Sequence, residues 1–113
     1  MKNELNNLAY SFVNTDSFAI KKDVCRLGSI RAAAEYSSEM AIGQPTWEEL
    51  STEDGVAALE VAIRDIVLGM RVKAGEDDDL DTGIINSTDG ENVTVNWDSL
   101  VTTRASFRNL TPL

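Results

Sequence analysis

Residues 52–73 read TEDGVAALEVAIRDIVLGMRVK, and this stretch decides the fold class that the sequence predicts. Apolar side chains recur in it at steps of three and four, which is the spacing of one face of an amphipathic α-helix. They are Val56, Leu59, Ile63, Ile66, Val67 and Met70. Ser51 or Thr52 can cap the start of this helix, and Gly75 can end it. We therefore expect one long helix whose apolar face lies in the core.

The preceding half of the chain contains two more segments with the same periodicity. Residues 3–13 predict a short helix. Residues 17–42 predict a long helix, which Asp16 or Ser17 can cap. Gly28 lies inside this second helix and weakens it unless another backbone packs closely against that position.

The pattern changes from helical to β in the last third of the chain. Residues 84–97 predict a β-hairpin, because two β-prone segments flank the dipeptide Asp89-Gly90, which favours a tight turn. One face of its second strand alternates through Val93, Val95 and Trp97. Residues 98–113 predict either a final helix or an extended arm, since two threonines disfavour the helix.

These segments together predict a mainly α fold, a small bundle of three or four helices with one C-terminal β-hairpin. We expect a single helical domain over residues 1–113, with an acidic loop at 76–81 between the last long helix and the hairpin. A capping-box pattern at 46–49 predicts one additional helical turn.

The chain shows no segment suited to secretion or to a membrane. Its first residues contain no apolar run that could serve as a signal peptide, and its longest run of Val, Leu or Ile covers only residues 66–68, too short for a membrane-spanning helix. It contains one cysteine, Cys25, so no disulfide can form within the chain. We expect an intracellular protein that is cytoplasmic or incorporated in a virion, with no membrane partner.

The net charge of −9 is unevenly distributed. Residues 1–34 carry five basic and three acidic side chains, residues 35–98 carry three basic and sixteen acidic ones, and residues 99–113 carry two basic ones. Basic ends and an acidic middle predict complementary surfaces, which suggests contacts between copies of the chain. Candidates for this interface are Lys21, Lys22, Arg26, Trp47, Trp97, Arg104, Phe107 and Arg108. The two tryptophans can equally be core residues.

Catalytic chemistry has little support in this sequence. Histidine is absent, which removes the commonest general base near neutral pH and the commonest transition-metal ligand. Cys25 lies beside a line of apolar positions, so we interpret it as a small buried hydrophobe. The loop at 76–81 does not match a calcium-binding loop, and we interpret it as solvated. We expect no catalytic residue, no metal and no cofactor.

One weak resemblance to an enzyme family exists in the acidic residues of the predicted helices. All-helical, magnesium-dependent nucleotide pyrophosphohydrolases use Glu-Glu-x-x-Glu and a later Glu-x-x-Asp. The acids here are loosely similar, but Glu53 lies one residue too far from Glu48-Glu49, and Asp65 lies two residues too far from Glu60. The resemblance implies a nucleotide hydrolase only as a remote alternative.

The function that best fits these features is a non-enzymatic interaction or assembly subunit, which we expect to be homo-oligomeric or to bind another protein. Small helical proteins with a hairpin and a basic tail occur among bacteriophage virion connector and head-completion proteins, which is an architectural similarity. The alternative from another class is an acidic inhibitor that imitates DNA and binds a host DNA-binding protein. The overall acidity argues against direct binding to nucleic acid.

Overall fold

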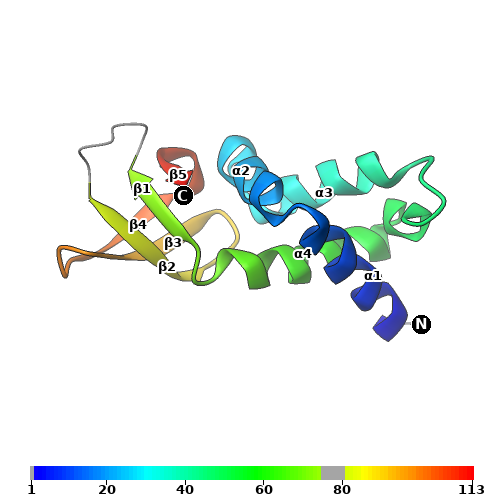
Figure 1. Ribbon diagram of the computed structural model, residues 1–113, viewed down its shortest axis with the longest axis horizontal. Helices are drawn as coiled ribbons and strands as arrows, with labels where there is room; N and C mark the ends of the chain where they lie inside the picture. The colour runs from blue at the N-terminus through cyan, green and yellow to red at the C-terminus, as the bar shows by residue number, and fades with distance from the viewer. Residues whose placement is uncertain (1, 75–80) are drawn as a thin grey trace.

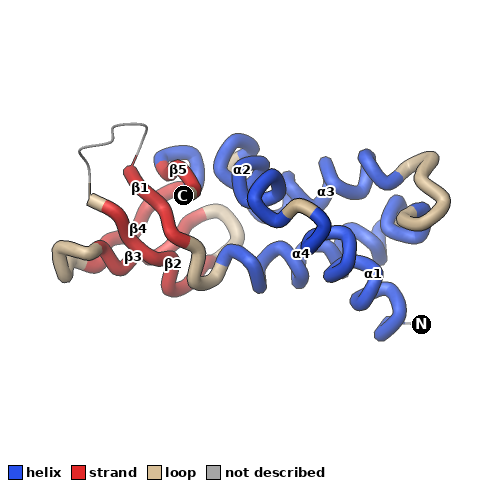
Figure 2. The backbone as a smooth tube through the Cα atoms, in the orientation of Figure 1, coloured by secondary structure: helices blue, strands red, loops and turns tan. Residues whose placement is uncertain are grey.

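The computed structural model describes residues 2–74 and 81–113, which form an elongated molecule of 45 × 22 × 19 Å (Figure 1). Helices gather at one end of the long axis and strands at the other (Figure 2). The helices and strands of the described residues are α1 (Lys2–Thr15), α2 (Ser17–Leu27), α3 (Ile30–Ala41), η1 (Glu48–Ser51), α4 (Glu53–Val67), β1 (Arg71–Ala74), β2 (Thr82–Thr88), β3 (Asn92–Trp97), β4 (Thr102–Ser106), η2 (Phe107–Asn109) and β5 (Leu110–Pro112).

The segment at 52–73 forms the predicted helix over most of its length. The Thr52 hydroxyl accepts a hydrogen bond from the backbone N–H of Gly55 (3.0 Å), which caps α4, and the apolar face is buried apart from the half-buried Ile66. The helix ends earlier than predicted, because Gly69 adopts a positive φ of 86° and turns the chain into β1. Gly75, the predicted cap, lies outside the described residues.

The predicted helix at 17–42 is wrong as a single element, because it consists of α2 and α3. Gly28 has a φ of 88° and ends α2, where its N–H bonds to the Val24 carbonyl. The Ser29 side chain then accepts a bond from the N–H of Ala32 and starts α3 (3.0 Å). The break is therefore built from a left-handed glycine followed directly by a new cap.

The expected three or four helices are confirmed, since the described residues form the α-helices α1 to α4. The mainly α bundle with one hairpin is wrong, because the chain is a mixed fold with a five-stranded antiparallel sheet of order β4-β3-β2-β1-β5. The hairpin at 84–97 is confirmed as β2 and β3, but these are inner strands. Residues 98–113 form no α-helix, because β4 pairs with β3 and β5 pairs with β1. Both edge strands of the sheet are short and come from this tail.

Two smaller predictions have different outcomes. The single turn near residue 46 exists as η1, but it begins after Trp47 without a side-chain cap, so the Thr46 capping box is wrong. The predicted loop at 76–81 lies outside the described residues except for Asp81. The carboxylate of Asp81 accepts hydrogen bonds from the backbone N–H groups of Thr82 (3.1 Å) and Ser99 (3.0 Å).

The helical end and the sheet share one hydrophobic core, to which Ile63 of α4, Val95 of β3 and Phe107 of η2 contribute fully buried side chains. α2 packs against η2 and β5, so the end of the chain returns to the helices (Figure 1). Across residues 2–74 and 81–113, no helix is both long enough and apolar enough to pass through a membrane.

Candidate protein-interaction surface

A groove with a cavity volume of about 500 Å³ lies between α2 and the C-terminal segment η2–β5. Three of the predicted interface residues, Lys22, Arg26 and Arg108, line it together. We call these three side chains the basic groove. Because Arg108 comes from the far end of the sequence, only the folded chain brings the three cations to one place.

Local structure explains how each cation is held. Lys22 and Arg26 are four residues apart, so they share one face of α2. Arg26 forms an ion pair with the half-buried Asp23 (3.0 Å). Arg108 donates a hydrogen bond through Nη2 to the carbonyl of Leu27 at the end of α2 (3.2 Å). The guanidinium thereby joins η2 to the helix and stays exposed at the groove.

Two aromatic rings accompany these cations. The Lys22 ammonium lies 5.4 Å from the centre of the Phe18 ring, and the Arg26 guanidinium lies 5.2 Å from the centre of the Tyr36 ring. Phe18 and Tyr36 are 47% and 40% exposed. A cationic surface with large exposed rings is typical of protein interfaces, in which Arg and aromatic residues are enriched. The i, i+4 spacing of Phe18 and Lys22 is a signal that sequence reasoning missed.

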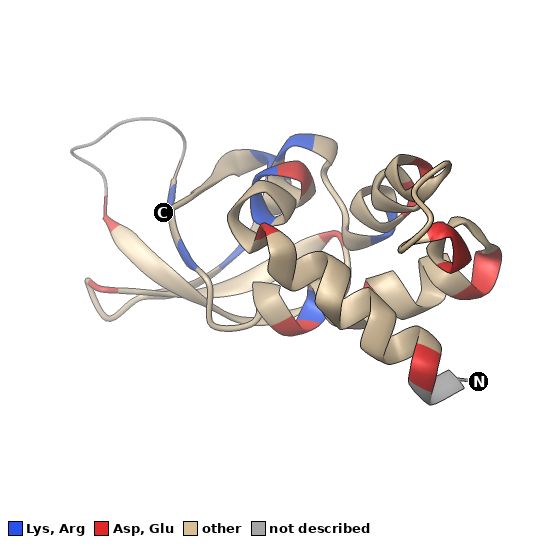
Figure 3. Ribbon diagram, turned by 45° about the vertical axis from the view of Figure 1, so that its right-hand side comes forward, with Lys and Arg blue, Asp and Glu red and all other residues tan. Residues whose placement is uncertain are grey.

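The opposite charge gathers where η1 and the start of α4 form the far end of the helical part (Figure 3). We call the exposed side chains of Glu48, Glu49, Glu53 and Asp54 the acidic end. The acidic end lies within residues 32–63, which contain no lysine or arginine, so none of its neighbours in the sequence neutralises these carboxylates. An apolar groove of about 710 Å³ adjoins the acidic end, with Leu5, Ala57 and Val61 in its lining. Charge and apolar surface are thus exposed together there.

None of the other interface candidates lines the basic groove. Trp47 is half-buried and packs edge-to-face on Phe12, with ring centres 5.5 Å apart. Trp97 is half-buried, and its Nε1 donates to the hydroxyl of Thr103 (2.7 Å). Both tryptophans pack against the core, the second of the two roles considered from the sequence.

The remaining three candidates differ in exposure. Lys21 is half-buried on α2 and is not part of the groove lining. Arg104 is exposed on β4 and forms an ion pair with Asp89 (2.5 Å). Phe107 is fully buried in the core of its own chain, so its side chain stabilises the fold and offers no free surface. From the sequence, aromatic character alone did not distinguish the buried Phe107 from the exposed rings of Phe18 and Tyr36.

Cys25 is confirmed as a buried side chain. Its burial raises the pKa of the thiol to about 11, which disfavours the reactive thiolate. Two of the acids considered for a magnesium site have partners within the fold, since Glu60 pairs with Arg31 (2.6 Å) and Asp65 accepts a hydrogen bond from the Tyr10 hydroxyl. Among the described residues, no group of three or more His, Cys, Asp or Glu side chains is placed to hold a metal ion.

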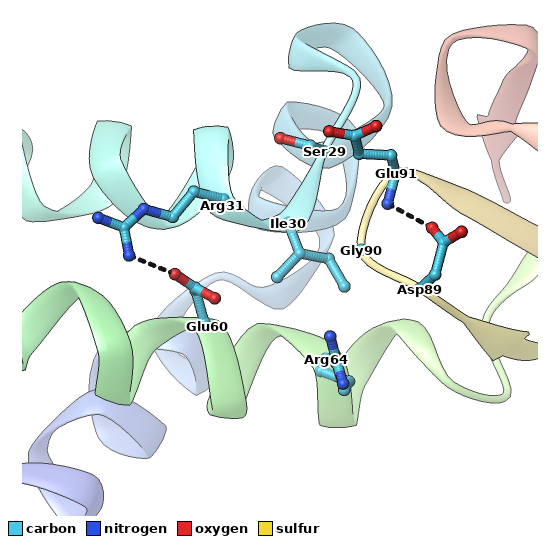
Figure 4. A pocket seen from close by; sticks show the side chains of 8 residues that line it. All are labelled: Ser29, Ile30, Arg31, Glu60, Arg64, Asp89, Gly90 and Glu91. Carbon is cyan, nitrogen blue, oxygen red and sulfur yellow. Dashed lines mark hydrogen bonds and ion pairs between the residues drawn. The ribbon is translucent and has the colours of Figure 1, made fainter.

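A cavity of about 400 Å³ lies where α3, α4 and the β2–β3 turn meet (Figure 4). The backbone N–H of Ile30 donates to the Gly90 carbonyl there (2.8 Å), which joins the helices to the sheet. The N–H groups of Glu91 and Asn92 donate to Asp89 and hold the pKa of that carboxyl below its ordinary value. Charges of both signs line this cavity, which suits a structural joint better than an anion or cation site.

Comparison of the chain with protein-family models, with curated proteins and with solved structures found no match. Inference about function therefore depends on the geometry and charge of the surfaces described above.

Proposed function

We propose that this protein is a non-enzymatic assembly subunit that acts by binding further copies of itself. The observation that carries the proposal is the separation of charge on the folded chain. The basic groove gathers three cations on a chain whose net charge is −9, and the acidic end exposes four carboxylates. Complementary surfaces on one molecule favour association of identical molecules.

The two surfaces do not meet within one copy. η1 packs mainly on α1, α3 and α4, whereas the basic groove lies between α2 and β5. α4 has 15 residues, so it spans about 22 Å from the acidic end toward the sheet. Each surface is therefore available to a neighbouring copy.

The support for assembly differs from that expected on the sequence. The hairpin and the C-terminal tail are not free arms, because both are paired within the sheet of their own chain. The uneven charge, which is already evident in the sequence, remains as the support for the proposal. A bacteriophage virion connector or head-completion protein is the setting we propose, because such subunits act through contacts with neighbouring subunits rather than through chemistry.

Size-exclusion chromatography with light scattering tests the proposal across protein concentrations, at low and at high salt. We expect a mass that exceeds the 12.3 kDa of one chain at low salt and decreases as salt rises, since ions screen exposed charges. A mass of one chain under every condition would contradict it. A single chain that instead captures a basic DNA-binding protein in a salt-sensitive manner would favour the inhibitor alternative.

A further inference from the structure

We propose that the basic groove of one copy receives the acidic end of the next copy, in a head-to-tail contact. This inference rests on the proposed self-association and names the two surfaces that form it. The occupant of the groove is residues 48–54 of a second copy, which contain four carboxylates and no basic residue.

Charge complementarity identifies this occupant. Within the groove, Asp23 is already paired with Arg26, so Lys22 and Arg108 leave a net positive lining. Lys22 has only the face of the Phe18 ring as its described partner, and Arg108 uses Nη2 for the Leu27 carbonyl. Remaining N–H donors of these side chains are therefore available to carboxylates of a neighbour.

The acidic end has the shape to reach a neighbour. η1 lies at the extremity of the helical part (Figures 1 and 3), and the side chains of Glu48 and Glu49 are exposed there. The rings of Phe18 and Tyr36 flank the cations and provide apolar contact area. The carboxylates of the acidic end can contact the cations, while the nearby apolar side chains of Leu5 and Val61 can contact the rings.

The symmetry of such an assembly follows from the positions of the two surfaces. The groove and the acidic end are different surfaces, so the contact is heterologous and cannot form a simple two-fold dimer by itself. Repetition of one heterologous contact generates a closed ring or an open filament. Single-stranded nucleic acid is the other occupant that cations and exposed rings suit, but the acidity of the whole chain disfavours it.

Paired charge reversals test the contact. The groove variant carries Lys22→Glu and Arg26→Glu, and the acidic-end variant carries Glu48→Lys and Glu49→Lys. We expect each variant alone to assemble at least about tenfold more weakly than the natural chain. An equimolar mixture of the two should regain assembly, because the new lysines of one variant then meet the new glutamates of the other.

A matched control carries Arg64→Glu and Arg71→Glu, which change the net charge as the groove variant does but lie on α4 and β1, outside the lining of the groove. We expect this control to assemble normally. Circular dichroism checks that each variant is folded, and Lys22→Glu alone replaces the groove variant if Arg26→Glu prevents folding. Light scattering of each species and of the mixture gives the readout.

The possible outcomes separate this inference from the proposed function. If the natural chain assembles and both folded variants assemble as well as it does, the head-to-tail contact is overturned while self-association stands. The same conclusion follows if the equimolar mixture stays dissociated. If a single-stranded oligonucleotide binds the natural chain and only this binding is lost in the groove variant, nucleic acid is the occupant and the inference is wrong. A natural chain that never associates overturns both.

Discussion

The guanidinium of Arg108 lies directly over Gly28. A Cβ atom on Gly28 would be 2.4 Å from Arg108 Nε, closer than any real contact allows. The same arginine donates to the Leu27 carbonyl (3.2 Å), so it covers the end of α2. This contact connects the break between α2 and α3 to the C-terminal segment that forms the other wall of the basic groove.

Gly28→Ala should destabilise the protein for two reasons. A left-handed φ of 88° costs a non-glycine residue about 1–2 kcal/mol, and the new methyl group also displaces Arg108. Gly43→Ala is the matched control, because its φ is 81° and, apart from its own chain neighbours, no described residue has an atom within 4 Å of the place that a Cβ atom would take there. Urea unfolding should show the larger loss for Gly28→Ala, and equal losses would contradict the role of Arg108.

Ile63→Ala should lower the free energy of unfolding by about 2–5 kcal/mol, because the side chain is fully buried in the core and leaves a cavity. Val61→Ala on the same helix is the control. Its side chain is 51% exposed, so we expect a change within about 0.5 kcal/mol. Chemical denaturation of both variants checks this, and similar losses at the two positions would mean that the assigned core face of α4 is incorrect.

Leu100→Gly should stabilise the protein. Leu100 has a positive φ of 71° and is 96% exposed, so its side chain contributes strain and almost no packing. The free energy gained by relieving that strain exceeds the entropic cost of ordering a glycine by about 0.5 kcal/mol. Leu100→Ala removes the side chain without relieving the backbone, and we expect it to be nearly neutral. Thermal unfolding distinguishes them; a lower midpoint for Leu100→Gly would refute the argument.

Asp89→Asn should lower stability at neutral pH and have less effect in acid. Backbone N–H groups of Asn92 (2.8 Å) and Glu91 (3.0 Å) donate to the carboxylate and lower its pKa in the folded chain. A lowered pKa stabilises the fold above the unfolded value of about 4, and this contribution disappears as pH falls through the lowered value. The urea midpoints of the two proteins should therefore differ at pH 7 and converge in acid, whereas the same difference at both pH values would contradict this.

Cys25 should react slowly with thiol reagents while the protein is folded. Its pKa of about 11 keeps the thiolate fraction at pH 8 on the order of a hundredfold below that of an unfolded cysteine, and burial adds a further barrier. Alkylation followed by mass spectrometry, with and without denaturant, measures the ratio. Comparable rates in both conditions would mean that the thiol is accessible in the native state.

Much of the local structure was predictable. Thr52 caps α4, and Asp16 caps α2 by accepting a hydrogen bond from the N–H of Ala19 (3.2 Å). The Asp89-Gly90 turn also lies where the pattern indicated. Each of these features depends on side chains within a few residues, so the sequence pattern contains the whole signal.

The candidate surface was predictable only in part. The sequence marked Lys22, Arg26 and Arg108 as interface candidates, but nothing in it indicated that Arg108 joins α2 or that Arg26 lies over Tyr36. Phe107 shows the opposite error, since it was a candidate for contact and is fully buried. Residues distant in sequence decide which side chains are covered, and periodicity carries no information about them.

The sequence by itself determined the buried face of α4, the caps of α2 and α4, the hairpin and the unequal distribution of charge, because these depend on composition and short-range spacing. Only the tertiary structure decided that 17–42 divides at Gly28, that 71–74 becomes a strand and that the tail supplies both edges of a sheet. Short strands gain stability from hydrogen bonds to partners that are distant in sequence, so only the fold decides which segments become strands.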